Sequence, residues 1–232
     1  LINPWTRSAG IGEANIASVR GLESMNLNVA NLAFTPKTEF IFSHTDWLAG
    51  ADISIDAFGF SQKMGESSVV GISIMSLTFG EVEVTTVDLP DGGIGTFKPF
   101  YLNIGMSYAK KFSNSISGGL TFKIISESIS DVTAQGMAID AGVNYVTGAY
   151  DQIKFGIALR NVGPPMVYRG SGLSFDATTQ DQTTLTAEQK ATKFEIPSLV
   201  NIGASYDLFP GGVPDSATGT MVSSHRITPS AN

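Results

Sequence analysis

Hydrophobic and polar residues alternate along several long stretches of this chain. Between residues 100 and 110, one face carries Phe100, Leu102, Ile104, Met106 and Tyr108. Small and polar residues occupy the other face, and the same pattern recurs over 116–127, 137–145, 153–160 and 200–207. A period of two predicts β-strands whose two faces meet different surroundings.

The predicted strands are long and are joined by short connections. Further candidates are 38–46, 52–61 and 67–87, the last with a bulge near Phe79 and Gly80, and a final strand begins near Ala217. Most are about ten residues long, whereas the strands of soluble proteins average about five or six. The connections at 112–114 and 148–151 are short enough for hairpins. The predicted fold class is all-β, with roughly nine antiparallel strands in a meander.

Two architectures produce this alternation, and they place the apolar face on opposite sides. A soluble β-protein, such as an adhesin, buries its apolar face and turns a charged face to water. A transmembrane β-barrel turns the apolar face to lipid and the polar face to its lumen. Here the polar face is mostly Gly, Ser, Asn and Ala. Only 15% of all residues are charged, against about 25% in ordinary soluble domains, so the composition favours the transmembrane barrel.

Tyrosines beside the short turns favour the same interpretation. Tyr108, Tyr145 and Tyr206 lie on the apolar face, each next to a turn at the end where the connections are short. The longer connections, 88–98 and 163–197, fall at the opposite end. Outer-membrane barrels have aromatic girdles at both interfaces, short periplasmic turns and long external loops. We therefore expect a protein of the bacterial outer membrane, in contact with its lipid.

The odd number of predicted strands bears on how the barrel closes. Single-chain bacterial barrels have an even number of strands, and an open sheet edge is not tolerated in lipid. We therefore expect the natural chain to continue beyond residue 232 and to close the barrel there. The expected organisation is an N-terminal segment over 1–34, followed by barrel strands over 35–232.

Charged residues interrupt the polar face of the predicted strands at five positions: Lys123, Glu127, Asp140, Lys154 and Arg160. Charges removed from water are stable only when they pair with opposite charges or hydrogen-bond partners. We predict that these five residues form an ion-pair network that fills the lumen. The alternative is that they line a channel.

The connection over 163–197 is the longest in the chain and is rich in Thr, Gln, Asp and Ala. It contains an apolar stretch formed by Pro164, Pro165, Met166, Val167 and Tyr168. A long loop without secondary structure is usually functional or disordered, and an exposed apolar tip is suited to a protein contact. We predict that this loop and 88–98 face a partner protein, with a mobile hydrophilic loop as the alternative.

Composition argues against several functional classes. The chain has 232 residues with a net charge of −7, so we expect no binding of nucleic acid. Cysteine is absent and only His44 and His225 are present, which leaves no thiolate or multi-histidine metal site. The sequence contains no run of 18 or more apolar residues, so it predicts no transmembrane helix. We expect no catalytic residues, no bound metal and no cofactor.

A series of short motifs resembles one family of membrane proteins. The chain opens with a small-residue and glycine run over 3–14, and residues 21–33 carry an Asn-rich stretch in which Val29 stands where that family has proline. Similar stretches follow at 42–48, 136–142, 159–163 and 223–227. In their order and spacing, these segments resemble the PorV/PorQ family of outer-membrane proteins of the type IX secretion system. The resemblance covers nearly the whole chain.

The resemblance implies a fold related to FadL-type fatty-acid transporters, with about 14 strands in the full chain. In such barrels the segment before the first strand enters the lumen as a plug. Asn26, Asn28 and Asn31 would then satisfy backbone groups inside the barrel. The alternative for this segment is a disordered leader.

The resemblance also implies a role in protein export without catalysis. PorV-like proteins accompany the SprA-type translocon barrel and bind exported cargo by its C-terminal signal domain. They then pass the cargo to a surface attachment complex. The alternative function is that of a FadL-like transporter of hydrophobic small molecules.

Overall fold

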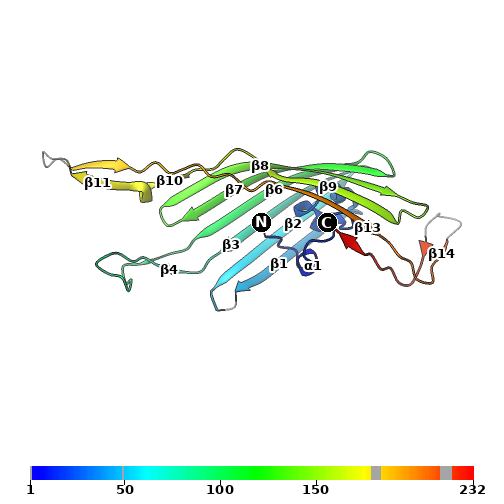
Figure 1. Cartoon of the computed structure of the whole chain (residues 1–232), viewed down its shortest axis with the longest axis horizontal. Helices are drawn as coiled ribbons and strands as arrows, with labels where there is room; N and C mark the ends of the chain where they lie inside the picture. Colours follow the sequence, from blue (N-terminus) through cyan, green and yellow to red (C-terminus); the bar gives the residue numbers. More distant parts are fainter. Residues whose placement is uncertain (1, 49, 179–183, 215–220) are drawn as a thin grey trace.

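The computed structural model describes residues 2–48, 50–178, 184–214 and 221–232, and within them the protein is all-β with antiparallel sheets (Figure 1). This confirms the fold class predicted from the alternation. The main sheet has ten strands. In spatial order they are β1 (Thr38–Leu48), β2 (Ile53–Met64), β3 (Ser68–Thr78), β6 (Phe100–Lys111), β7 (Ile116–Ile129), β8 (Val132–Thr147), β9 (Ile153–Val162), β13 (Leu199–Tyr206) and β16 (Ser230–Ala231), with β10 (Tyr168–Arg169) pairing with β8.

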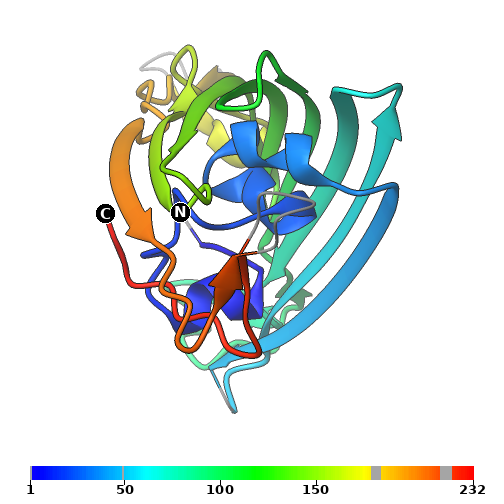
Figure 2. The ribbon, with the colours of Figure 1, turned by 90° about the vertical axis from the view of Figure 1, so that its right-hand side faces the viewer.

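The sheet curls around the N-terminal segment of the chain (Figure 2). This segment contains α1 (Thr6–Gly10) and two 3-10 helices, η1 (Gly21–Asn26) and η2 (Val29–Phe34). The sheet ends at β1 on one side and at β16 on the other, and β16 pairs with β13 through two residue pairs. Among the described residues no pairing joins β1 to β16, so no closed barrel is found in this part of the chain.

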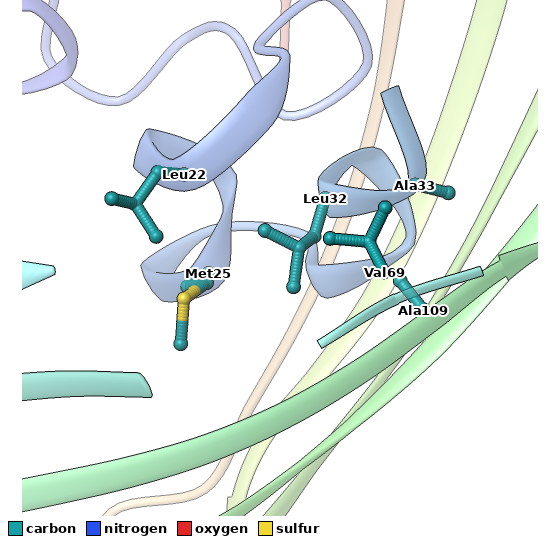
Figure 3. Close-up of a cluster of buried hydrophobic side chains, with 6 residues drawn as sticks. All are labelled: Leu22, Met25, Leu32, Ala33, Val69 and Ala109. Atoms are coloured by element: carbon teal, nitrogen blue, oxygen red, sulfur yellow. The ribbon is translucent and has the colours of Figure 1, made fainter. Parts of the chain in front are cut away.

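The hydrophobic core lies between the N-terminal segment and the inner face of the sheet. Leu22, Met25 and Leu32 of the two 3-10 helices pack against Val69 of β3 and Ala109 of β6 (Figure 3). All five side chains are almost fully buried. Because the segment supplies most of this core, the inner face of the sheet does not need a second sheet to cover it.

A second cluster buries the start of the chain in the same way. Trp5 is 2% exposed and packs with Ile55, Ala57, Met75 and Leu77 on the inner face of β2 and β3. The outer face of the sheet, by contrast, leaves its large apolar side chains exposed. Examples are Phe40, Phe42, Ile72, Met106, Leu120, Phe122, Ile139, Ile157 and Ile202.

The segment predicted as one strand over 67–87 leaves the sheet earlier than expected. β3 ends at Thr78, and Gly80 has a φ of +71°, which turns the chain away from the sheet. The following residues form a separate small hairpin of β4 (Val82–Glu83) and β5 (Thr96–Phe97). The predicted single strand with a bulge is therefore wrong beyond Thr78.

Short hairpins extend from both ends of the main sheet (Figure 1). β11 (Ser174–Thr178) pairs with β12 (Thr184–Glu188) at the same end as β4, and β14 (Val213–Pro214) pairs with β15 (Met221–Val222) at the other end. A further 3-10 helix, η3 (Ser171–Leu173), precedes β11. The start predicted near Ala217 for the final strand lies outside the described residues.

Within the described ranges, no helix is both long and apolar enough to span a membrane.

Candidate functional site

Two of the three asparagines predicted to lie inside the barrel, Asn28 and Asn31, are fully buried, whereas Asn26 is half-buried. The Asn28 side chain donates from Nδ2 to the Val143 carbonyl oxygen of β8 at 3.1 Å, and its Oδ1 accepts from the Ala30 backbone N–H at 3.1 Å. Asn31 Nδ2 donates to the Ile16 carbonyl oxygen at 2.9 Å. Asn26 instead lies at the wall of an interior cavity. Asn28 and Asn31 thus both satisfy backbone groups, but only Asn28 joins the segment to the sheet, because Asn31 bonds within the segment.

Inner-face glycines make room for this contact. A Cβ atom on Gly119 of β7 would lie 2.8 Å from the Val29 carbonyl oxygen, and one on Gly156 of β9 would lie 3.0 Å from the Ile16 carbonyl oxygen. Any larger side chain at these positions would therefore collide with the backbone of the N-terminal segment. The small residues that alternate with large apolar ones along the strands are the surface on which the segment rests.

Lys123 and Asp140 form a buried ion pair on the inner face of β7 and β8. Lys123 Nζ lies 2.5 Å from Asp140 Oδ2, and the two side chains are 5% and 3% exposed. Lys123 also donates to Asn161 Oδ1 at 3.0 Å, while the Asn161 backbone N–H donates to Asp140 Oδ1 at 2.7 Å. Asn161 has a φ of +57° beside the register shift between β8 and β9. The irregularity in β9 thus directs the Asn161 backbone N–H toward the Asp140 carboxylate.

The other charged residues of the inner face pair elsewhere. Lys154 pairs with Asp207, and Arg160 Nη1 lies 3.3 Å from Glu13 Oε2. Glu127 accepts a hydrogen bond from the Tyr168 hydroxyl at 2.8 Å. The five predicted residues all lie on the inner face, but only Lys123 and Asp140 pair with each other. The sequence predicted a single network, whereas the structure shows separate pairs. The reason is that Lys154, Arg160 and Glu127 bind groups outside strands β7, β8 and β9, namely Asp207, Glu13 and Tyr168.

Two of these partners, Glu13 and Asp207, were missed by sequence reasoning. Asp207 follows β13 on the face that carries Ser205, and Ser205 lies directly opposite Lys154 in the register of β9 and β13. Strand register was therefore a usable signal for this pair. Glu13 belongs to the N-terminal segment, whose path across the sheet is not encoded in any strand pattern.

An interior cavity of about 240 Å³ lies between the sheet and the segment around 194–197. Its apolar wall includes Met75, Ile125 and Phe194, and its polar wall carries charges of both signs: Lys123, Glu127, Arg160 and Glu195. Among the described atoms, Arg160 Nε is buried without a hydrogen-bond partner. The cavity therefore combines an apolar surface with charged groups of both signs.

The stretch predicted as an exposed apolar tip is partly turned inward. Pro164 and Pro165 are exposed and Val167 is half-buried, but Met166 is only 2% exposed. Met166 fills the space beside Gly136 of β8, where a Cβ atom would lie 2.6 Å from the methionine Cγ. The prediction of a protein-binding tip is therefore wrong for Met166, because this flexible apolar side chain is buried against Ile125, Ala134 and Ala138.

Tyr168 also turns toward the protein. Its ring stacks on Phe194 with the ring centroids 5.2 Å apart, and its hydroxyl bonds to Glu127. Burial, together with this hydrogen bond and the Glu127 charge, raises the pKa of Tyr168 to about 12. The tyrosine therefore remains protonated and continues to donate near neutral pH, fixing the loop to the end of β7.

We expect Tyr168→Phe to lower the free energy of unfolding by about 1 kcal/mol, because Glu127 loses a hydrogen-bond donor. A urea titration followed by tryptophan fluorescence measures this change. Tyr150→Phe, in an exposed turn, is the matched control and should change stability by less than about 0.5 kcal/mol. Equal effects of the two substitutions would contradict the anchoring role of Tyr168.

The three predicted girdle tyrosines lie on the outer face of the sheet. Tyr108, Tyr145 and Tyr206 are 49%, 43% and 43% exposed, and each lies near the end from which β14 extends. Tyr108 Oη lies 3.0 Å from Ser68 Oγ of the neighbouring strand. Each tyrosine thus presents an apolar ring with a polar hydroxyl on the exposed outer face.

The opposite end of the molecule carries an exposed hairpin within the loop 163–197. Phe175 of β11 and Leu185 of β12 are 53% and 54% exposed. Residues 179–183 lie outside the described residues. The described part of the loop thus contains more secondary structure than the sequence predicted, and the hairpin carries two of its large exposed apolar side chains, Phe175 and Leu185.

Comparison with models of known protein families finds no match for this chain, and comparison with curated proteins finds none either.

Proposed function

We propose that this protein is a non-enzymatic binding component of the bacterial outer membrane. The observation that carries the proposal is the exposed apolar surface on the outer face of the sheet. On β7, Ile116, Leu120, Phe122 and Ile124 are between 43% and 58% exposed. Monomeric soluble proteins rarely expose contiguous apolar surface on this scale.

The length of this apolar surface agrees with a membrane. Residues 116–124 extend about 26 Å along the strand at ~3.3 Å per residue, or roughly 20 Å across a membrane after a tilt of about 40°. Polar side chains limit the surface at one end, where His44 Nδ1 lies 2.7 Å from Asp56 Oδ1 on the outer face of β1 and β2. The tyrosines described above limit it at the other end.

The N-terminal segment covers the inner face of the sheet, which supports a binding role more than a role as a channel or transporter. The N-terminal segment rests on inner-face glycines, and the charged groups of the interior are paired. On the resemblance of its motifs, we propose that the protein acts in the type IX secretion system. It would associate with the SprA-type translocon, bind the C-terminal signal domain of cargo and serve a surface attachment complex.

Affinity purification from the native outer membrane tests this proposal. The tagged protein, solubilised in mild detergent, should bring with it a very large barrel protein or proteins that share a C-terminal β domain. Phe175→Asp combined with Leu185→Asp should reduce cargo recovery, whereas Val213→Asp, exposed at the opposite end, should not. Recovery of the protein in the soluble fraction would contradict the membrane assignment, and recovery without any protein partner would contradict the secretion role.

The interior cavity favours one second function, transport of a hydrophobic small molecule. Its apolar wall suits the hydrocarbon part of such a molecule, and its charged wall suits a polar head group. Mass spectrometry of an organic extract of the purified protein tests this alternative. A bound fatty acid or lipid that is lost in Met75→Trp, which fills the cavity, would favour transport, and an extract without any such ligand would contradict it.

A further inference from the structure

Four basic residues converge at the end of the sheet that carries the short turns. They are Arg7 of α1, Arg20 before η1, Lys154 of β9 and Arg226 after β15, and together they line a small cavity. We call them the basic cluster. They come from four separate parts of a chain that has only 14 basic residues and a net charge of −7. The cluster is therefore a local concentration of positive charge in an acidic protein.

The basic cluster is not balanced by acidic groups. Asp207 is the one acidic residue among the described side chains that line this cavity. Its carboxylate pairs with Lys154 and accepts a hydrogen bond from Thr228 Oγ1 at 2.7 Å, while Arg226 Nη1 lies 4.0 Å away. Although burial raises the pKa of Asp207, the hydrogen bonds from Lys154 and Thr228 lower it below its ordinary value. A single negative charge is thus shared among several positive ones.

Arg20 is held in place by neutral groups. Its Nη1 donates to Asn31 Oδ1 at 2.6 Å and to the carbonyl oxygens of Ala17 and Val19, and its guanidinium lies 4.0 Å from the centre of the Phe34 ring. Burial lowers the pKa of Arg20 to about 10, so the group remains charged at neutral pH. A preorganised, charged guanidinium therefore faces the cavity without an acidic partner of its own.

The cavity has the size and the donors for a small oxyanion. Its volume is about 90 Å³, which corresponds to about three water molecules at ~30 Å³ each. The Ser18 hydroxyl also lines it, whereas the Thr228 hydroxyl already donates its one proton to Asp207. Guanidinium forks match the oxygens of a phosphate group, and a bound anion would offset the repulsion among the cations.

We propose that the basic cluster binds a phosphate group, carried either by a phospholipid head group or by free phosphate. This assignment rests on the charges and donors of the cavity and does not depend on the proposed role in secretion. A phosphate anion would lie among Arg7, Arg20 and Arg226, with Lys154 continuing to pair with Asp207.

Calorimetric titration of the full purified chain tests the proposal. The probes are inorganic phosphate and dihexanoyl phosphatidic acid, each added at constant ionic strength set by sodium chloride. The variant is Arg7→Gln combined with Arg226→Gln, because both side chains are exposed and neither anchors the core. The matched control is Arg169→Gln combined with Lys190→Gln, which removes the same charge from the far end of the molecule.

Binding of either probe should weaken at least tenfold in the variant and remain unchanged in the control. Without phosphate, the variant should unfold at the same temperature as the natural protein or slightly higher, since it removes repulsion. Similar affinities for the two probes would identify free phosphate as the ligand, and at least tenfold tighter binding of phosphatidic acid would identify a lipid head group. Failure of both probes to bind, or equal weakening in the control, would overturn the proposal.

Discussion

Replacing Asp140 with asparagine is expected to lower the free energy of unfolding by about 3–5 kcal/mol, the cost of leaving a buried charge without its partner. Asparagine keeps the shape of the side chain and its acceptor for the Asn161 backbone N–H. It removes only the negative charge that faces Lys123, whose side chain is 5% exposed. Because the Lys123 side chain is almost fully buried, much of the cost of its desolvation falls on the native state.

A urea titration followed by tryptophan fluorescence measures this loss, because Trp5 is buried in the core beside the inner face. Asp176→Asn makes the same change on an exposed hairpin and should have little effect. Combining Asp140→Asn with Lys123→Met removes the unpaired charge as well and should recover most of the lost stability. A double variant no more stable than Asp140→Asn would show that the loss of stability comes from packing and not from the unpaired Lys123 charge.

Replacing Gly119 with valine is expected to cost about 3 kcal/mol, because the new side chain would collide with the backbone of the N-terminal segment. Its Cβ atom would lie 2.8 Å from the Val29 carbonyl oxygen and 3.1 Å from the Ala109 Cβ. Neither neighbour is a flexible side-chain end that can move aside. The collision should push η2 away from the sheet and expose residues 2–34 to proteases.

The adjacent glycine provides a matched control on the same strand. A Cβ atom on Gly118 faces outward and would lie close to the ring of Phe112, an exposed side chain that can move, while the Gly142 carbonyl oxygen lies at an ordinary contact distance of 3.5 Å. Gly118→Val should therefore leave both stability and protease resistance nearly unchanged. Limited proteolysis with urea titration distinguishes the two variants. Equal behaviour would contradict the contact between the N-terminal segment and the inner face.

Much of the sheet could be predicted because alternation is a local property of the sequence. In β6, the alternation of Phe100, Leu102 and Ile104 with smaller residues indicated both the strand and its two faces, and the structure places each residue accordingly. The buried pair of Lys123 and Asp140 follows from the same information. Lys123 lies opposite Ala138, which places Asp140 two residues along the same face.

The remaining features depend on contacts between distant segments. Glu13 pairs with Arg160 only because the N-terminal segment crosses the sheet at that point. Met166 turns inward because Gly136 leaves space on a strand about 30 residues earlier in the chain. Neither contact has a local pattern, so sequence reasoning placed Met166 on an exposed tip and left Glu13 unassigned.

The claim that the outer face contacts lipid is tested most directly by fluorescence quenching in reconstituted vesicles. Because the chain has no cysteine, Leu120→Cys and Asp176→Cys each provide one labelling site, on the outer face of β7 and on the exposed hairpin. We predict that a fluorophore at position 120 is quenched by lipids brominated in mid-chain and shielded from aqueous iodide, while one at position 176 shows the reverse. Iodide quenching at position 120, without quenching by the brominated lipid, would contradict the membrane assignment.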